Sequence, residues 1–518
     1  MDHDGSLRKR LPQPLAPNPP PVTKSPQGAL DSNGSLENTR PVRVIALSGS
    51  LNHPKDQTMT GLFEKMMAGA WNRIVAGNNR PHLSGGLNFG TAVVDGNLSR
   101  TPVLISHIKR TEHIATLGKT GTGKTSLLKY MVAQDIAADR GFVFFDHHGD
   151  TAPYILARIA EQEQKRLIDL SPRLIVIEPG DRQYSVGLNV LEHQTGFGNF
   201  NAIEEFSQIL KQRWHLESFG ARTEELLRNA LCVLADCHLT VLELAPLLSN
   251  AAFRADCVRR STNEEVRSYF EDRYDRASEP MQAVYRDAIL NKVTAFTADP
   301  HFRHILGQSE SSFSLVQAID NGYWIILNLD KGRLGEQAAT LGSLFLTKLK
   351  NALFSRQRRN SLFTLYCDEM QNLVAYGSGL ETLLSEARKF GVSVVSANQF
   401  FDQHPAEVRS ALLAVGTHVC FQLSSTDAEK MAAALDGGKP LAELLRNLPQ
   451  RHIVVKSGHQ RWIQATVPEV VTPRINPTDL HIRCRVRWAK SRTDVEREIR
   501  ARQVAVAPNT REALNDWE

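Results

Sequence analysis

The sequence predicts an α/β fold with a mostly parallel central sheet, and three observations support this. Short apolar runs typical of buried strands alternate with helical patterns over residues 113–177 and again over 323–455. Strands joined through helices pair in parallel and are covered on both faces, so their runs are apolar throughout. Over 195–300, by contrast, apolar residues keep helical spacing and no strand-like run occurs. We therefore expect an all-α insertion within an α/β domain.

The strands of the sheet are expected where compact apolar runs end in Gly, Asp, Asn or another polar residue. The first helix after a strand is expected over Ser126–Ala138, because Leu128, Met131, Val132 and Ile136 form one apolar stripe. The expected strands are His113–Leu117, Gly141–Phe145, Leu174–Ile177, Tyr323–Leu329, Leu362–Cys367, Val392–Ala397, Val419–Leu423 and Ile453–Val455.

Composition sets the expected domain boundaries. Seven of the 24 prolines lie in the first 30 residues, so residues 1–40 are expected to form a disordered Pro-rich arm. Short apolar runs broken by Gly, Asn and Pro predict a small strand-rich N-terminal region over 41–110. The α/β domain is then expected in two parts, 111–194 and 301–475, on either side of the all-α insertion at 195–300.

Positive charge gathers at the C-terminal end of the chain. The whole chain carries +5, whereas residues 451–500 alone hold 11 Lys and Arg against 5 Asp and Glu. Residues 476–518 are expected to form a basic helix, exposed and carrying Val495 and Ile499 one turn apart, followed by a tail. A basic end suits an anionic polymer, but a solvated surface explains the same charges equally well.

Several classes of protein are excluded. The longest uncharged apolar stretch, residues 410–426, is shorter and more polar than the ~20 apolar residues of a membrane helix, and no signal-peptide core follows the N-terminus. The six cysteines are widely spaced, which favours reduced thiols over a disulfide framework. Cys232, Cys237 and His238 lack a second ligand pair at zinc spacing. We expect a cytoplasmic protein without a membrane anchor of its own.

A phosphate-binding loop is the strongest chemical signal. Residues 118–125, Gly-Lys-Thr-Gly-Thr-Gly-Lys-Thr, match the pattern G-x-x-x-x-G-K-[ST] between a predicted strand and a predicted helix. Its backbone N–H groups can surround the phosphates of a nucleotide, Lys124 supplies a positive charge, and the Thr125 hydroxyl reaches Mg²⁺. We therefore expect ATP and Mg²⁺ as cofactors. The expected nucleotide contacts are Gly118, Thr120, Gly121, Thr122, Gly123, Lys124, Thr125 and Ser126.

An acidic pair follows a second predicted strand. Asp368 and Glu369 come directly after the apolar run 362–367, at the strand end where α/β proteins bind ligands. With the phosphate loop present, Asp368 is the candidate Mg²⁺ ligand and Glu369 the candidate base for an attacking water. A base in this position favours hydrolysis over nucleotide binding alone.

Two further residues are candidates for catalysis. Gln399 follows the predicted strand 392–397 and can sense the γ-phosphate, while Arg388 can reach the phosphates of a neighbouring subunit. Each has a structural alternative. Arg388 suits the last turn of a helix that ends at Gly391, and Gln399 can act as a cap.

The ordered set of motifs resembles the HerA/FtsK superfamily of hexameric RecA-like motors, over residues 100–470. Within it, the motifs are most similar to conjugative coupling proteins of the TraG/TraD type and to soluble HerA-like translocases. The matching segments are His113–Thr125, Phe145–Asp150, Phe302–Gln308, Asn328–Gly335, Asp368–Asn372, Leu384–Gly391 and Ala397–Gln399.

The resemblance implies a RecA-like P-loop NTPase fold with an all-α domain inside the motor. It also implies that Lys124 and Thr125 bind nucleotide and Mg²⁺, that Asp368 binds Mg²⁺ and that Glu369 is the base. Gln399 would sense the γ-phosphate, and Arg388 would act in trans. The sequence departs from the family at His147, where relatives usually carry proline, and in lacking the transmembrane helices of anchored coupling proteins.

These features predict an ATP-driven ring motor, a homo-hexamer, that translocates duplex DNA without regard to sequence. One alternative is a coupling ATPase that delivers protein or nucleoprotein to a type IV secretion channel, with a place at the periphery of a membrane complex. Another is a nucleotide-gated adaptor. A relaxase, a nuclease or a channel component are the further partners that the resemblance suggests. The basic residues weighed as DNA contacts, with a solvated face as the alternative, are Arg356, Arg358, Arg359 and those from Arg483 to Arg492.

Overall fold

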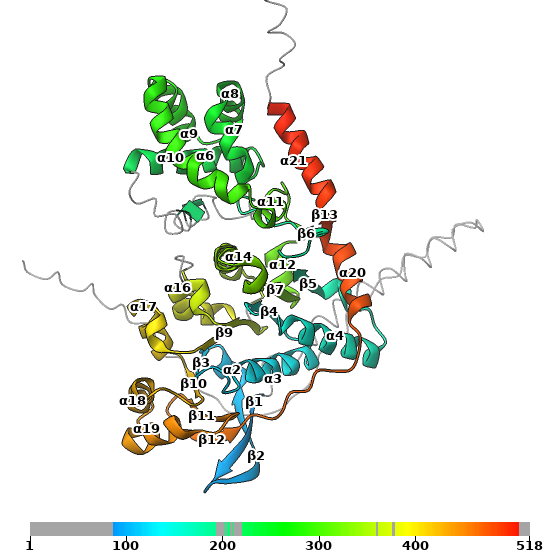
Figure 1. The fold of residues 1–518 in the computed structure, drawn as a ribbon, viewed down its shortest axis with the longest axis vertical. Coiled ribbons are helices and arrows are strands. Elements are labelled where there is room, and N and C mark those ends of the chain that lie inside the picture. The colour runs from blue at the N-terminus through cyan, green and yellow to red at the C-terminus, as the bar shows by residue number, and fades with distance from the viewer. Residues whose placement is uncertain are drawn as a thin grey trace, which may run out of the picture. The chain divides into compact units, whose positions relative to one another are not determined.

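The computed structural model describes residues 86–192, 220–358, 361–374 and 379–506, together with 203, 204, 206, 207 and 210 (Figure 1). All of these belong to one unit of the chain, Arg80–Glu518. The Pro-rich arm predicted for 1–40 and the predicted strand region before residue 86 lie outside the described residues, as does the tail after 506.

An eleven-stranded sheet organises the described residues, in the order β2-β1-β12-β11-β10-β3-β9-β8-β4-β7-β5. Seven neighbouring strands, from β10 to β5, are parallel, and their residues are almost all buried because helices cover both faces. The mostly parallel sheet predicted from the sequence is confirmed. These strands are β3 (Ile114–Leu117), β4 (Gly141–Asp146), β5 (Leu174–Ile177), β7 (Trp324–Asn328), β8 (Phe363–Asp368), β9 (Val392–Asn398) and β10 (Thr417–Cys420).

Four antiparallel strands extend the sheet beyond β10. Residues 86–106, expected within a small strand-rich N-terminal region, do form strands, but these strands pair with the C-terminal part of the chain rather than standing apart. Gly90 permits this approach, since a Cβ there would lie 2.1 Å from the Thr466 carbonyl oxygen. The four strands are β1 (Gly86–Val94), β2 (Asn97–Ser106), β11 (His452–Ser457) and β12 (Ile463–Thr466).

Alternate residues of each central strand enter two different cores. In β4, Phe142 and Phe144 pack with α3 (Lys124–Ala137), α4 (Ala152–Arg166) and α20 (Thr478–Trp488). Val143 and Phe145 pack on the other face. The helices of that second face are α12 (Leu315–Asp320), α14 (Gln337–Phe354), α16 (Leu380–Glu386), α17 (Ala406–Leu413), α18 (Ser425–Ala434) and α19 (Gly438–Asn447).

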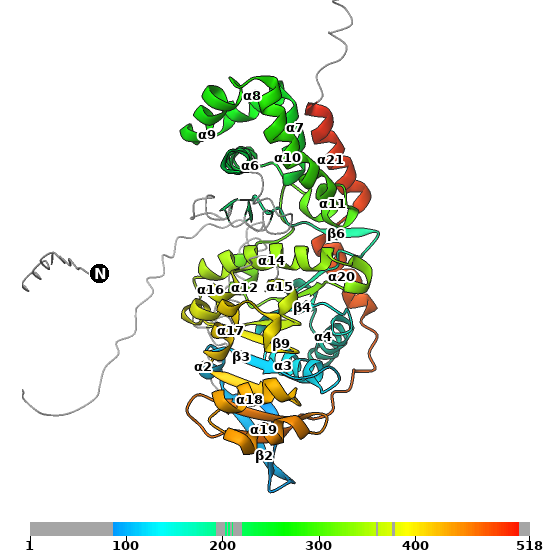
Figure 2. The same cartoon turned by 60° about the vertical axis from the view of Figure 1, so that its left-hand side comes forward.

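In the segment predicted as an all-α insertion, the residues described between 220 and 297 form helices joined by short turns, with no strand among them, and Figure 2 shows these helices gathered together. Its helices are α6 (Ala221–Asp236), η3 (Val241–Glu243), α7 (Leu244–Ser249), α8 (Ala251–Arg260), α9 (Glu264–Ser268), η4 (Tyr269–Tyr274) and α10 (Glu279–Thr297). The short connecting elements are α2 (His107–Arg110), η1 (Ser171–Arg173), α11 (Pro300–Leu306), α13 (Lys331–Leu334), α15 (Gln371–Val374), η5 (Ala387–Phe390) and η6 (Phe401–Gln403).

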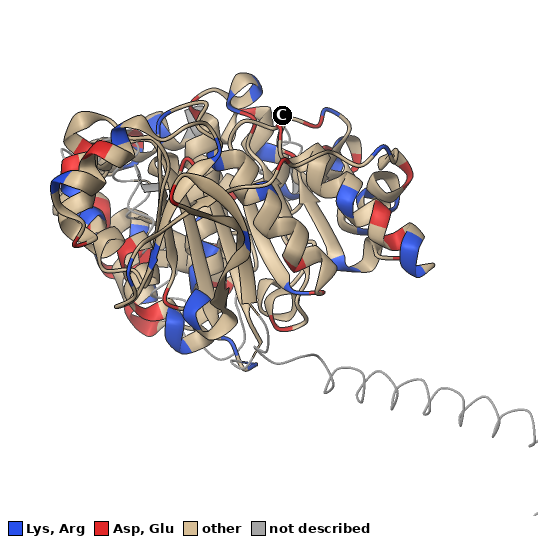
Figure 3. Ribbon diagram, turned by 90° about the horizontal axis from the view of Figure 1, so that it is seen from below, with Lys and Arg blue, Asp and Glu red and all other residues tan. Residues whose placement is uncertain are grey.

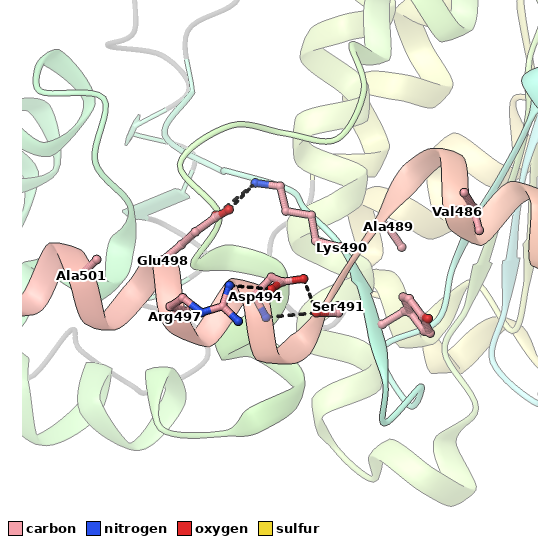
Figure 4. A pocket seen from close by; sticks show the side chains of 9 residues that line it. Val486, Ala489, Lys490, Ser491, Asp494, Arg497, Glu498 and Ala501 are labelled. Atoms are coloured by element: carbon pink, nitrogen blue, oxygen red, sulfur yellow. Dashed lines mark hydrogen bonds and ion pairs between the residues drawn. The ribbon is translucent and has the colours of Figure 1, made fainter.

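The C-terminal segment connects the sheet to the helical insertion. After α20, β13 (Ala489–Ser491) pairs antiparallel with β6 (Tyr184–Val186), and α21 (Arg492–Val506) begins at once. The expectation that this last helix is exposed is wrong for one face, because Val495 and Ile499 are fully buried against Leu242. Lys490 bridges to Glu498 on the outer side (Figure 4).

Across the described ranges of the chain, no helix has the length and apolar content to span a membrane.

Candidate nucleotide-binding site

The phosphate loop lies between the end of β3 and the start of α3. Gly121 and Gly123 have φ angles of 79° and 115°, which residues other than glycine rarely adopt. Gly118 is excluded from carrying a side chain for a different reason, since a Cβ there would lie 2.5 Å from Phe421 Cβ. The glycines of the motif therefore meet steric requirements of the turn, and α3 begins at Lys124 with its N-terminus toward the loop.

The loop is fastened on both sides to neighbouring strands. The Gly118 N–H donates to the Asn398 carbonyl at the end of β9, and the Lys119 N–H donates to the Gln422 carbonyl just after β10. Lys124 is buried and its Nζ donates to the Gly118 and Lys119 carbonyls at 2.6 and 3.0 Å. Burial lowers the pKa of Lys124, and the nearby carboxylates of Asp368 and Glu369 oppose this change.

Thr125 and Asp368 form the candidate Mg²⁺ site. The Thr125 hydroxyl donates to Asp368 Oδ2 at 3.1 Å, and burial raises the pKa of Asp368 to about 6. One hydroxyl and one carboxylate oxygen side by side suit Mg²⁺, which in nucleotide sites takes few protein ligands and completes its shell with phosphates and water. Among the described residues, no group of three or more His, Cys, Asp or Glu could hold a metal ion by itself.

Glu369 is held in an unusual position beyond the end of β8. Its φ of 50° is in the left-handed region, which costs free energy for a residue with a side chain. Three side chains donate hydrogen bonds to its carboxylate: Gln399 at 2.7 Å, and Asn372 and His148 at 3.2 Å each. Burial favours a higher pKa for Glu369, but His148 and the other donors override this and lower it.

Gln399 links this carboxylate to the phosphate loop. While its amide nitrogen donates to Glu369, its amide oxygen accepts a hydrogen bond from the Thr120 hydroxyl at 3.1 Å. The structure thus brings Lys124, Thr125, Asp368, Glu369 and Gln399 together at the carboxyl ends of β3, β8 and β9, as the sequence predicts.

Arg388 is not part of this group. It lies in η5, before the start of β9, and its Nη2 is 3.3 Å from Glu112, which precedes β3. The amino ends and the carboxyl ends of parallel strands lie on opposite sides of a sheet. Arg388 is at the amino ends of the strands, whereas its own phosphate loop is at their carboxyl ends. Its side chain is 60% exposed.

Several contacts of the site have no signal in the local sequence. The Gln450 side chain donates to the Gly121 carbonyl at 3.0 Å, and the Arg451 N–H donates to the Thr122 carbonyl at 2.9 Å. Both residues lie in the turn before β11, and nothing in their local sequence suggests a nucleotide site. His148 lies within the motif Phe145–Asp150, but its contact with Glu369 depends on β4 and β8 being neighbours in the sheet.

The loop after β4 is held by hydrogen bonds, although His147 stands where members of the family usually carry proline. Asp146 accepts hydrogen bonds from four backbone N–H groups, those of residues 148, 149, 151 and 152. His147 is buried, and burial lowers its pKa to about 4. Asp150 is exposed and lies 3.5 Å from Lys129.

Most of the basic residues weighed as DNA contacts are engaged within the chain. Arg356 is buried and pairs with Asp320, Arg485 pairs with Asp181, and Arg483 pairs with Glu163, Asp169 and Asp479. Arg359 lies outside the described residues. On the face drawn in Figure 3, basic and acidic residues are interspersed. These three arginines therefore form ion pairs within the chain, which favours a structural role for them over a phosphate contact.

The parallel sheet, the phosphate loop after β3 and the acidic pair after β8 define a RecA-like P-loop nucleotide-binding fold. Residues 88–194 match the family model of the central domain of helicase HerA. The resemblance to HerA/FtsK-type P-loop ATPases that the motifs indicated is therefore confirmed. No curated protein matches the sequence.

Solved structures share the fold at low sequence identity. The plasmid coupling protein TrwB in complex with the ATP analogue ADPNP is 17% identical, with a TM-score of 0.54, over 77% of this chain and 97% of that one. TrwB in complex with ADP and Mg²⁺ gives the same identity and coverage with a TM-score of 0.51. VirB4 of Thermoanaerobacter pseudethanolicus is 15% identical, with a TM-score of 0.52, over 75% and 97% of the two chains.

Proposed function

We propose that this protein is an ATP-hydrolysing ring motor that translocates DNA. The observation that carries the proposal is the meeting of Lys124, Thr125, Asp368 and Glu369 at one edge of the sheet, which supplies every group that ATP hydrolysis needs from one subunit. The match to the HerA central domain and the likeness to a plasmid coupling protein support DNA as the substrate.

Each residue has a role in the proposed reaction. The phosphates bind to the backbone N–H groups of residues 118–125 and to the Lys124 ammonium. Lys124 then donates to the phosphates instead of to the carbonyls of Gly118 and Lys119. Mg²⁺, held by Thr125 and Asp368, would neutralise phosphate charge. Glu369 accepts the proton of the attacking water, and Gln399, between Thr120 and Glu369, reports the state of the phosphate loop to the base.

Arg388 completes the site of a neighbouring subunit in this proposal. Its exposed position at the edge of the sheet opposite its own phosphate loop suits contact in trans better than contact in cis. The resemblance to the HerA/FtsK superfamily of hexameric motors supports a homo-hexameric ring. We place the protein in the cytoplasm, either free or beside a membrane complex, with a relaxase, nuclease or channel component as a partner.

ATPase assays with and without duplex DNA separate this function from its alternatives. For a motor, duplex DNA raises the rate many-fold, the stimulation falls steeply with salt because DNA contacts release counterions, and Glu369→Gln abolishes it. A protein-delivering coupling ATPase or an adaptor would be indifferent to DNA and would respond to a protein partner. Hydrolysis that is indifferent to duplex DNA at every salt concentration contradicts the proposal.

A further inference from the structure

The carboxylate of Glu369 is almost fully occupied by hydrogen bonds. An ionised carboxylate offers about four acceptor positions on its two oxygens. His148 and Gln399 both donate to Oε1, and Asn372 donates to Oε2. One position on Oε2 is left, which is enough for a single water. The donors therefore determine where on the carboxylate a water can be activated.

The three donors are held in different ways. Asn372 belongs to the same turn as Glu369, whose carbonyl accepts the Asn372 N–H, so it moves with the base. Gln399 is joined to Thr120 and therefore follows the phosphate loop. His148 alone among these three donors comes from the loop after β4, which is neither the segment of the base nor the phosphate loop.

The loop that carries His148 is fixed by its backbone. Asp146, buried at the end of β4, accepts the N–H groups of His148 and Gly149 on Oδ1 and two later N–H groups on Oδ2. Gly149 has a φ of 73°, and a Cβ there would lie 3.1 Å from Asp330 Cβ, so the loop is also packed from outside. The imidazole of His148 is thus presented from a rigid support.

We propose that His148 is a positioning residue for the base Glu369, an inference that rests on the proposed ATP hydrolysis. Its Nε2–H donates to Glu369 Oε1 at 3.2 Å, since an ionised carboxylate can only accept. This bond ties the base to the end of β4 and keeps the remaining acceptor position of Oε2 toward the water. Without it, the carboxylate rotates about its side-chain bonds and meets the water in the productive orientation less often.

The effect falls on the chemical step. His148 donates to the base and makes no hydrogen bond to the phosphate loop among the described contacts, so nucleotide binding does not depend on it. Misplacing a catalytic group by about 1 Å can cost on the order of a hundredfold in rate. We expect His148→Ala to lower kcat by about ten- to a hundredfold and to change KM by less than about twofold.

Three variants test this role. His148→Gln keeps an N–H donor at similar reach and restores most of kcat, whereas His148→Ala does not. His459→Ala is the matched control, because His459 is an exposed histidine of the β11–β12 turn, and it keeps wild-type kinetics. Since the His148 side chain is 53% exposed, its truncation opens no buried cavity and the variant folds. Equal losses in the Ala and Gln variants, or a KM that changes with kcat, overturn the positioning role.

A measurement without turnover tests the contact itself. The thermal midpoints of His148→Ala, Glu369→Ala and the double variant should be non-additive, because either single change removes the same hydrogen bond. Additive shifts overturn the contact. Absence of ATP hydrolysis in the wild type overturns the proposed function and the role of His148 with it. Wild-type hydrolysis with an unaffected His148→Ala overturns only the positioning role.

Discussion

The Thr125 hydroxyl donates to Asp368 Oδ2 at 3.1 Å, although 243 positions separate the two residues in the sequence. Thr125 lies in the first turn of α3 and Asp368 is the last residue of β8, so this bond joins the phosphate loop to the acidic edge of the sheet. Two oxygen atoms that suit Mg²⁺ are thereby adjacent within one folded subunit.

Lys124→Ala should abolish nucleotide hydrolysis and weaken ATP binding by at least about tenfold, because the Lys124 ammonium lies against the loop carbonyls, where the phosphates would bind. Lys165→Ala is the matched control, since Lys165 is an exposed lysine of α4, outside the phosphate loop. Titration with a fluorescent ATP analogue measures both affinities. Equal affinities of the two variants would contradict the assignment of Lys124.

Arg388→Ala and Lys124→Ala should complement each other when mixed. Each variant alone is inactive, but a mixed ring contains interfaces in which an intact phosphate loop meets an intact Arg388. Partial recovery of ATPase activity on mixing is the expected result. Activity that stays absent in mixtures that co-assemble would show that Arg388 does not act in trans.

A buried ion pair between α2 and α3 should contribute strongly to the free energy of unfolding. Arg110 donates two hydrogen bonds of 2.7 Å to Asp135, and both side chains are fully buried. Asp135→Asn leaves the guanidinium without its counter-ion and should lower the free energy of unfolding by about 3–5 kcal/mol. Asp256→Asn, which removes the exposed partner of Arg259, should cost less than about 1 kcal/mol. Urea titration measures both, and equal small losses contradict this interpretation.

Stability should fall with acid well before the carboxylates of the surface titrate. Burial lowers the pKa of four histidines to about 4, so they stay neutral in the folded state while the unfolded chain binds protons near its ordinary pKa. Their contribution is complete above about pH 6.5 and is lost as the pH falls toward 4, by about 1.4 kcal/mol per pH unit for each. These histidines are His107, His113, His147 and His404.

The raised pKa of Asp368 acts in the opposite direction, since that carboxyl favours the folded state as it takes up a proton below about pH 6. One such group does not balance four histidines. Urea titrations between pH 7.5 and 5 should therefore show a decrease in the free energy of unfolding, and a constant or rising value would contradict the burial of these histidines.

The parallel half of the sheet could be predicted because its strands are compact apolar runs, and the run at 141–145 is buried throughout as β4. The meeting of Lys124 and Asp368 could be predicted for a geometric reason, since parallel strands end at the same edge. Local patterns contain no information about which distant strands pair, so the pairing of β1 with β12 could not be foreseen.

Contacts between distant parts of the chain also explain why the burial of α21 and the role of His148 in the site could not be predicted. Val495 and Ile499 look like the sparse apolar positions of an exposed helix until Leu242, from another part of the chain, is known to cover them. His148 contacts Glu369 only because β4 lies beside β8. Motifs identify residues with intrinsic chemistry, whereas the residues that hold them in place depend on the tertiary fold.

Displacement of a third strand from a DNA triplex separates translocation from ATP hydrolysis alone, because the strand is released only when a motor moves along the duplex. For a DNA motor, displacement requires ATP and is lost in Glu369→Gln, while Lys165→Ala displaces the strand as the wild type does. Hydrolysis of ATP on the same DNA without displacement of the third strand would contradict translocation.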